Sequence, residues 1–254
     1  MSFTRVLTSN IQAGTSAAGR RTNAEELAAA YDGVQVDVLA LQEVDQDQHR
    51  SGRINQLQVI ADALDLPHRR YAAAIGSDLR YSRKPAASIG DHSGPGYGVA
   101  LASQYPVISW FTTRLPRSVS KLPMWQRGRL GWWVHEPRVA LVAVLQGPNG
   151  PFAAATTHLS LITAVATWQL RTLLAKVQGL NMPAVVTGDF NLGAVAVARA
   201  SKSWDRANAH TFPADAPNRQ IDHILVHGGS ATRPQALRLP ISDHCALSSE
   251  VVWS

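Results

Sequence analysis

The chain has 254 residues, of which 45% are hydrophobic and 17% are charged, and its formal net charge is +6. This composition is typical of a globular protein, and at this length the chain forms one large domain or two small ones. A single cysteine, Cys245, excludes an internal disulfide and a cysteine-based zinc cluster.

In chain order, short apolar runs rich in Val and Ile and bounded by Gly, Pro or Asn predict β-strands. These runs are 3–11, 36–41, 71–75, 98–102, 107–112, 138–145, 152–157, 184–187, 221–226 and 245–252. The turn residues 148–150 join two of them into a hairpin over 138–157. Apolar periodicity predicts three helices, one capped by Thr22 or Asn23 and two at 55–64 and 164–180.

Many short strands with few helices and no linker predict a two-sheet sandwich flanked by helices, as a single domain over 1–254. The longest irregular segments are 76–96 and 115–136. Loops of that length in a compact domain are usually functional or disordered.

Two polar clusters follow or precede apolar strands in the second half of the chain. Asp189 and Asn191 lie two residues apart, so an extended backbone turns both side chains to one side. Asp243 and His244 stand just before the strand at 245–252. Because strand ends present polar groups to ligands, these clusters indicate a hydrolase.

Four more polar residues stand at strand ends. Asn10, Glu43 and His158 close apolar runs, and Asp222 opens one. Each alone has an ordinary interpretation: a turn former, a surface charge or a satisfied histidine. Together with the two clusters, however, they would lie on one rim of the sandwich.

The donor types on this rim predict its chemistry. Asn10, Glu43 and Asp243 offer hard oxygen ligands without a thiolate, which suits Mg²⁺ or Mn²⁺. Two histidines and several carboxylates supply acid and base groups near neutral pH. These are the groups that metal-assisted phosphodiester hydrolysis requires.

Six motifs span nearly the whole chain: TSNI at 8–11, LQEVD at 41–45, THL at 157–159, GDFN at 188–191, IDHILV at 221–226 and SDH at 242–244. In sequence and in order they resemble those of the endonuclease/exonuclease/phosphatase superfamily. This is the group of deoxyribonuclease I, abasic-site endonucleases, neutral sphingomyelinases and inositol phosphatases.

This resemblance implies an α/β (α+β) fold, a four-layer sandwich of two mainly antiparallel sheets with outer helices. It also implies a role for each matched residue. Glu43 would be the principal Mg²⁺ ligand, with Asn10 and Asp243 nearby. Asp189 would activate water, Asn191 would hold the phosphate, and His244 would pair with Asp222 to stabilise the transition state. His158 would donate to a phosphate oxygen or protonate the leaving group. Arg138 would be a cation either beside the phosphate or behind the residues that contact it.

Two positions depart from the family pattern. Ser9 stands where the family often has Trp or Tyr, which we interpret as a packing change. The Glu that supports the histidine matching His158 in deoxyribonuclease I has no convincing equivalent, because the nearby strand contains Tyr97 instead. A nuclease-style His–Glu pair is therefore not predicted.

The substrate must be inferred from the loops. The segment 115–133 interleaves Arg and Lys with Met124 and three tryptophans, and Arg80, Arg83 and Lys84 lie in the other long loop. Basic residues with aromatics suit nucleic acid, so a nuclease acting on DNA or RNA is the first hypothesis. The same mixture suits a membrane surface, so a lipid or small-molecule phosphoesterase is the alternative. Equally, the tryptophans could simply pack the sandwich.

A third hypothesis is a non-catalytic binding module on the same fold, which the intact set of matched residues disfavours. Cys245 beside His244 resembles a catalytic dyad, but a lone Cys in a strand is more commonly a small buried residue. We expect a monomer, since no surplus apolar stripe is visible. No segment has the length of a membrane span or the pattern of a signal peptide, so we expect a cytoplasmic protein.

Overall fold

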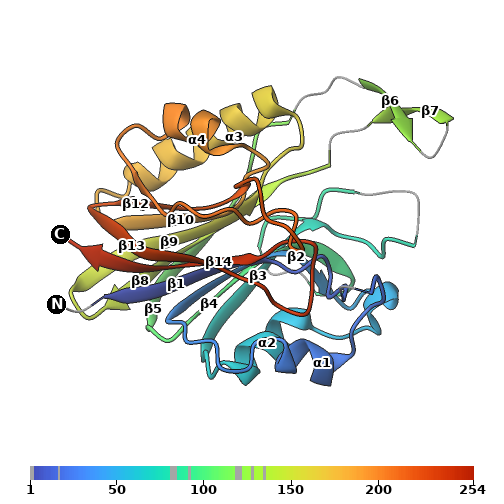
Figure 1. Cartoon of the computed structure of the whole chain (residues 1–254), viewed down its shortest axis with the longest axis horizontal. Helices are drawn as coiled ribbons and strands as arrows, with labels where there is room; N and C mark the ends of the chain where they lie inside the picture. Colours follow the sequence, from blue (N-terminus) through green and yellow to red (C-terminus); the bar gives the residue numbers. More distant parts are fainter. Residues whose placement is uncertain are drawn as a thin grey trace.

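A computed structural model describes residues 3–16, 18–80, 85–90, 93–117, 122–126, 129–133 and 136–254. This part of the chain forms two six-stranded sheets packed face to face, with helices on the two outer faces (Figure 1). The sandwich of two sheets predicted from the sequence is therefore confirmed.

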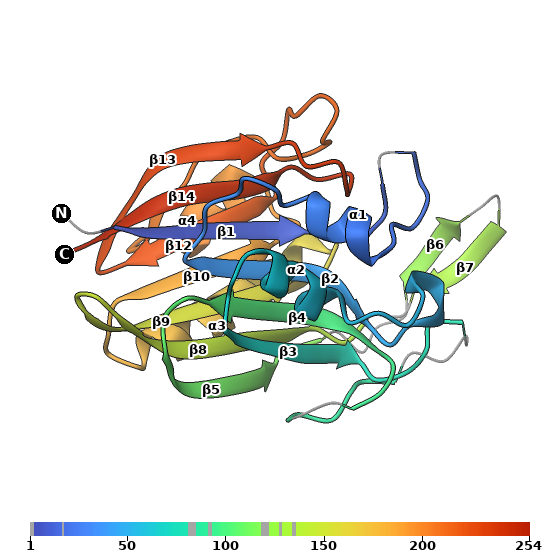
Figure 2. The same ribbon diagram turned by 90° about the horizontal axis from the view of Figure 1, so that it is seen from below.

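The first sheet has the strand order β13-β14-β1-β2-β4-β3 and is antiparallel except between β1 and β2. β1 lies between β14 and β2, so the segments nearest the two ends of the chain are neighbours (Figure 2). The strands are β1 Thr4–Asn10, β2 Val38–Gln46, β3 His68–Ile75, β4 Gly96–Ser103, β13 Gly229–Leu237 and β14 Ala246–Trp253.

The second sheet has the order β11-β12-β10-β9-β8-β5 and is antiparallel except between β9 and β10. A separate two-stranded ribbon, β6 and β7, projects from one end of the molecule (Figures 1 and 2). The strands are β5 Val107–Arg114, β6 Leu122–Gln126, β7 Arg129–Trp133, β8 Val139–Gly147, β9 Gly150–His158, β10 Ala184–Asp189, β11 Asp205–Arg206 and β12 Asp222–His227.

Helices α1 (Ala24–Ala29) and α2 (Gln56–Ala63) cover the first sheet, and α3 (Thr163–Gln178) and α4 (Ala194–Ala200) cover the second (Figure 1). The side chain of Asn23 caps α1 in a capping box with Glu26, and that of Asn55 caps α2. A one-turn 3-10 helix, His49–Ser51, follows β2. No helix of the described chain is both long enough and apolar enough to cross a membrane.

Both faces of the central strands are buried, which explains why these strands are apolar throughout. In β1, Val6 packs between the sheets whereas Leu7 packs under α1 and α2. In β9, Ala154 packs between the sheets and Ala155 packs under α3. Alternating side chains therefore fill three apolar layers.

Glycine is required where β10 approaches β9. Gly188 has φ +141°, and a Cβ at this position would lie 1.9 Å from the carbonyl oxygen of Thr157. The missing side chain lets the two parallel strands pair up to their ends, where Asp189 stands opposite His158.

The structure confirms the hairpin, which forms as β8 and β9, and the three predicted helices, with Asn23 as the first N-cap. It adds α4, whose alternation of Ala and Val gives no helical period, and β13, which is mostly exposed and so lacks an apolar run. The segment 115–136 was predicted to be irregular, but the β6–β7 ribbon lies inside it.

Candidate active site

The first sheet contributes an amide and a carboxylate to the end of the sandwich. Asn10 is the last residue of β1, and Glu43 lies in β2 at a register shift between Gln42 and Val44. Glu43 has φ +55°, as expected for a residue bulged out of the ladder. A bulge re-aims a side chain, and here the Asn10 Nδ2 donates to Glu43 Oε1 at 3.2 Å.

The second sheet places three polar residues side by side. The register of β9, β10 and β12 pairs Asp189 with His158 on one side and with Asp222 on the other. Their side chains are almost completely buried, and His158, the most exposed of the three, is 8% exposed. Adjacent strand ends therefore supply a row of titratable groups in a dry environment.

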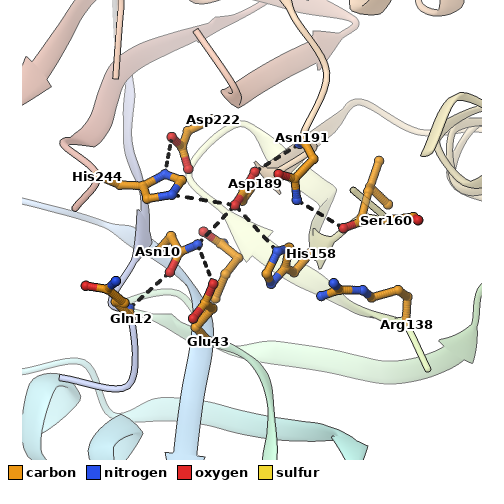
Figure 3. A network of polar contacts seen from close by, with 12 residues as sticks. Asn10, Gln12, Glu43, Arg138, His158, Ser160, Asp189, Asn191, Asp222 and His244 are labelled. Atoms are coloured by element: carbon orange, nitrogen blue, oxygen red, sulfur yellow. Dashed lines mark hydrogen bonds and ion pairs between the residues drawn. The ribbon is translucent and has the colours of Figure 1, made fainter. Parts of the chain in front are cut away.

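Asp189 is the hub that joins the two contributions (Figure 3). Its Oδ2 accepts from Asn10 Nδ2 at 3.0 Å and lies 3.5 Å from His158 Nε2 and 3.9 Å from His244 Nε2. Its Oδ1 accepts from the backbone N–H of Asn191 at 2.9 Å. Both oxygens are thus fixed, and the carboxyl group is held between an amide and two imidazoles.

His244 is fixed by contacts on several sides. Its Nδ1 donates to Asp222 Oδ2 at 2.9 Å, and the same oxygen accepts from the Thr211 hydroxyl at 2.6 Å. The ring of Phe212 packs edge-on against the imidazole, with 4.9 Å between ring centroids. Nε2 of His244 therefore faces Asp189, while Nδ1 is committed to Asp222.

Burial and neighbouring charge move the pKa values of three groups in different directions. Burial, followed by the nearby Asp222 carboxylate, raises the pKa of Asp189 to about 7. Burial opposes the charge on His244, but the hydrogen bond and charge of Asp222 prevail and raise its pKa to about 9. Burial, with Arg138 and His244 nearby, holds the pKa of His158 well below its usual range. Near neutral pH the site therefore contains a cationic His244, a neutral His158 and an Asp189 poised to exchange a proton.

The oxygen donors at the open edge of the site are suited to a metal ion. Glu43 forms no ion pair within the described residues. The side chain of Asp243 is half-exposed, and its one ion-pair partner in the described chain is His244, whose Nε2 lies 3.9 Å from Asp243 Oδ1. The adjacent Glu43 carboxylate and Asn10 amide supply the oxygen ligands that Mg²⁺ and Mn²⁺ prefer, and the Asp243 carboxylate is a third candidate donor. Asp189, Asp222 and His244 also lie close enough to hold an ion. In that cluster, however, His244 Nδ1 and Asp222 Oδ2 are already hydrogen-bonded to each other at 2.9 Å, so we favour the open edge.

Arg138 and Asn191 border the hub without touching its carboxyl through their side chains (Figure 3). Arg138 is 8% exposed and lies 3.7 Å from Glu136, so its charge is partly balanced. The side chain of Asn191 donates to the carbonyl of Leu159 at 3.2 Å, and its backbone has φ +51°. This hydrogen bond holds the Asn191 amide beside β9, at the mouth of the site.

Several residues that support the site were not singled out in the sequence. Gln42, completely buried beside Glu43, donates to Thr8 at 3.0 Å and to Thr156 at 2.9 Å, which ties the two sheets together. Thr211, which holds Asp222, comes from a loop without a strand pattern. The sequence does contain a signal for this link between the sheets, because Gln42 is a polar residue inside an apolar run. No sequence signal marks Thr211.

Beside Asp243 lies an open cavity of about 240 Å³, large enough for part of a substrate. Its lining includes Gln12, Asp215 and Arg238, and Arg238 pairs with Asp215 at 2.6 Å. The cavity therefore offers polar and charged side chains beside Asp243.

Most described cations near the site have carboxylate partners. Arg50 pairs with the buried Asp45 at 2.7 Å, and Arg80 pairs with Asp78 at 3.0 Å. Arg83 and Lys84, two of the candidate substrate-binding cations, lie outside the described residues, as do Lys121 and Arg127 of the segment 115–133. The side chains of 122–126 and 129–133, including all three tryptophans of the ribbon, are likewise not described.

Cys245 is not part of the site. It is 3% exposed, and its thiol contacts the carbonyl of Ala214 at 3.6 Å. The interpretation as a small buried residue is confirmed.

Comparisons with known proteins place this geometry in context. The model of the endonuclease/exonuclease/phosphatase family matches residues 7–244. The protein YbhP of Escherichia coli strain K12 is 30% identical over 264 residues, covering 97% of this chain and 95% of YbhP.

Solved structures share the fold at lower identity. A mannosyl-6-phosphatase from Bacteroides thetaiotaomicron is 17% identical with a TM-score of 0.68, over 98% of this chain and 100% of that one. Sphingomyelinase C from Streptomyces griseocarneus is 15% identical with a TM-score of 0.64, over 99% of this chain and 100% of that one. At these identities the likeness concerns the fold alone.

Proposed function

Because the chain belongs to the endonuclease/exonuclease/phosphatase family, whose members hydrolyse phosphoesters, we propose that it is a divalent-metal-dependent phosphodiesterase. The observation that carries this proposal is the buried Asp189, whose pKa is raised to about 7 and which lies within 4 Å of two imidazoles and the Asn10 amide. A carboxyl group tuned in this way can accept a proton from water at neutral pH.

Asn10, Glu43 and Asp243 would hold the cation, Mg²⁺ or Mn²⁺. When bound there, it would neutralise charge on the phosphate. The bulge at Glu43 and the turn after Asn10, where the N–H of Gln12 donates to Asn10 Oδ1 at 3.0 Å, preset the two ligands from the first sheet.

The residues of the second sheet would move the protons. Asp189 orients the attacking water and takes its proton, since both carboxylate oxygens are already fixed by Asn10 and Asn191. His244, cationic because of Asp222, faces the pentacovalent phosphorus and balances its developing negative charge. His158 donates a hydrogen bond to a phosphate oxygen or to the leaving group, and Asn191 and Arg138 border the phosphate.

Nucleic acid is the substrate class that we propose first. The net charge of +6 favours a polyanion, and the segments 76–96 and 115–133 contain several Arg and Lys residues. A DNA or RNA enzyme would engage several phosphates at once, so its affinity would fall steeply as salt rises.

A phospholipid or small phosphoester is the second candidate, and one observation favours it. Arg50, Arg80 and Arg238 are each held by an aspartate, which reduces the positive charge that the described rim offers to a long polyanion. A single phosphate with a polar group in the cavity beside Asp243 needs fewer free cations.

The test is a hydrolysis screen with Mg²⁺ or Mn²⁺ and an EDTA control. Its substrates are plasmid DNA, an abasic oligonucleotide, RNA, sphingomyelin, a sugar phosphate and a chromogenic bis-phosphodiester. We expect metal-dependent turnover of at least one of them, lost in Asp189→Asn. Turnover that persists unchanged in that variant, or none with any substrate, would contradict the proposal and favour a binding module.

A further inference from the structure

The α3/α4 layer has an unusual outer surface. Leu161, Trp168 and Val195 are 55%, 54% and 65% exposed, which makes them three of the largest apolar exposures in the described chain. No large hydrophobic residue is comparably exposed on α1 or α2, the corresponding layer of the other sheet. Exposed apolar side chains grouped on one layer indicate an interaction surface.

The charges on this layer are all of one sign. The segments 159–182 and 190–204 contain Arg171, Lys176, Arg199 and Lys202 but no Asp or Glu. All four are exposed, and none forms an ion pair with a described residue. Arg171 follows Trp168 by about one helical turn, and Arg199 follows Val195 by one turn, so each cation is adjacent to an exposed apolar side chain on its own helix.

We propose that the α3/α4 surface, defined by Leu161, Trp168, Val195, Arg171 and Arg199, docks on an anionic lipid membrane. Unpaired cations next to exposed Trp and aliphatic side chains match such an interface, because the cations meet anionic headgroups while the apolar groups enter the acyl boundary. Aliphatic side chains neither bind phosphate nor stack on bases, so nucleic acid fits this surface less well. A purely apolar protein partner would leave four cations without counter-charges.

The position of this surface ties it to the catalytic end of the molecule. Leu161 lies three residues after His158, and Val195 lies four residues after Asn191. The two helices begin just beyond the strand ends that carry the site, and the β6–β7 ribbon extends from the same end (Figure 1). Docking through the start of α3 and α4 would therefore bring the mouth of the site close to the membrane.

The experiment is co-sedimentation of the full chain, in EDTA, with vesicles of phosphatidylcholine alone or mixed with phosphatidylglycerol. We expect binding only to the mixed vesicles, weakening as salt rises. Arg171→Glu with Arg199→Glu should lower the partition coefficient by about tenfold or more. Leu161→Ser with Trp168→Ser should lower the partition coefficient by a similar factor and should abolish the binding that persists at high salt.

Matched controls lie elsewhere on the molecule. Ile108, on edge strand β5 at the far end of the second sheet, is 57% exposed, and Arg233, on β13, is exposed in the first sheet. Ile108→Ser and Arg233→Glu should bind vesicles as the wild type does. Glu43→Gln should also bind normally, so docking can succeed or fail independently of the proposed catalysis.

Three results would overturn the proposal. Equal binding, or none, to both kinds of vesicle would exclude anionic lipid as the partner. Loss of DNA binding in the variants, with weak vesicle binding throughout, would make the surface a nucleic-acid track. A wild-type dimer that the variants dissociate would make it a self-association face. The lipid and salt dependence of the wild type tests the idea even if a variant fails to fold.

Discussion

The two halves of the candidate site are built for different tasks. The half from the second sheet, with Asp189 and Asp222 and the His244 that Asp222 holds, is buried and has displaced pKa values. The half at the open edge, with Glu43 and Asp243, is partly exposed. Glu43 has no ion-pair partner in the described chain, and Asp243 has only His244, 3.9 Å away. In the buried half, burial shifts the pKa values of the groups that we propose transfer protons. At the open edge, the partly exposed carboxylates are available to bind a cation.

Changes in the buried half should alter proton chemistry, and changes at the open edge should alter metal binding. Asp189→Asn has the largest expected effect, a loss of about 10³-fold in kcat, because the proton acceptor is removed. Its metal requirement should stay near that of the wild type. Residual activity and half-saturating Mg²⁺, measured in parallel, check both statements.

The same variant makes a separate prediction about stability. The raised pKa means that Asp189 stabilises the fold below about pH 4, and that this contribution is lost as pH rises towards about 7. Asp189→Asn should therefore gain thermal stability relative to the wild type across that interval. Melting temperatures at pH 4 and pH 8 measure the effect, and a variant that is less stable at pH 8 would contradict the dry environment inferred for this group.

Asp222→Asn should lower kcat by about 10²-fold through loss of the charge on His244. His244 contributes stability below about pH 6.5, and this is lost as pH rises through about 9, because Asp222 holds the ring protonated. In the variant the pKa of His244 should fall, and the alkaline limb of the pH–rate profile should move to lower pH. An unchanged profile would mean that another group sets that limb.

Glu43→Gln should raise the Mg²⁺ or Mn²⁺ concentration for half-maximal activity by about 10- to 100-fold, while excess metal recovers part of the rate. Melting in EDTA should remain close to that of the wild type, because Glu43 forms no ion pair with any described residue. If metal titration is unaffected, the ion is held elsewhere, and the cluster of Asp189, Asp222 and His244 becomes the next site to test.

Gln42→Leu should have the smallest effect on chemistry and a measurable one on stability. It leaves the hydroxyls of Thr8 and Thr156 without their buried partner, which costs about 1–3 kcal/mol. Denaturant titration measures this loss. Adding Thr156→Val should recover part of it, because the unpaired hydroxyl is removed, whereas a further loss would show that Gln42 does not act through Thr156.

The sequence predicted the strands and site residues that share a local signal. Asp189 and Asn191 stand directly after an apolar run, and Asn10 and His158 close theirs, so burial and polarity change at adjacent residues. It did not predict α4 or β13, because one lacks a helical period and the other an apolar face. The contacts of Thr211 and Gln42 depend on loops and sheets meeting across more than 10 residues, which no local pattern encodes.

The pairing of β1 with β14 also determines when the candidate site can form during synthesis of the chain. Asn10 is made early, yet the neighbour that flanks its strand comes from Ala246–Trp253, and His244 comes just before that. While the ribosome is still adding the segments in between, β1 has one open edge and the candidate site is incomplete. The candidate site of a nascent chain therefore cannot assemble until residues near 253 have emerged and the first sheet has closed.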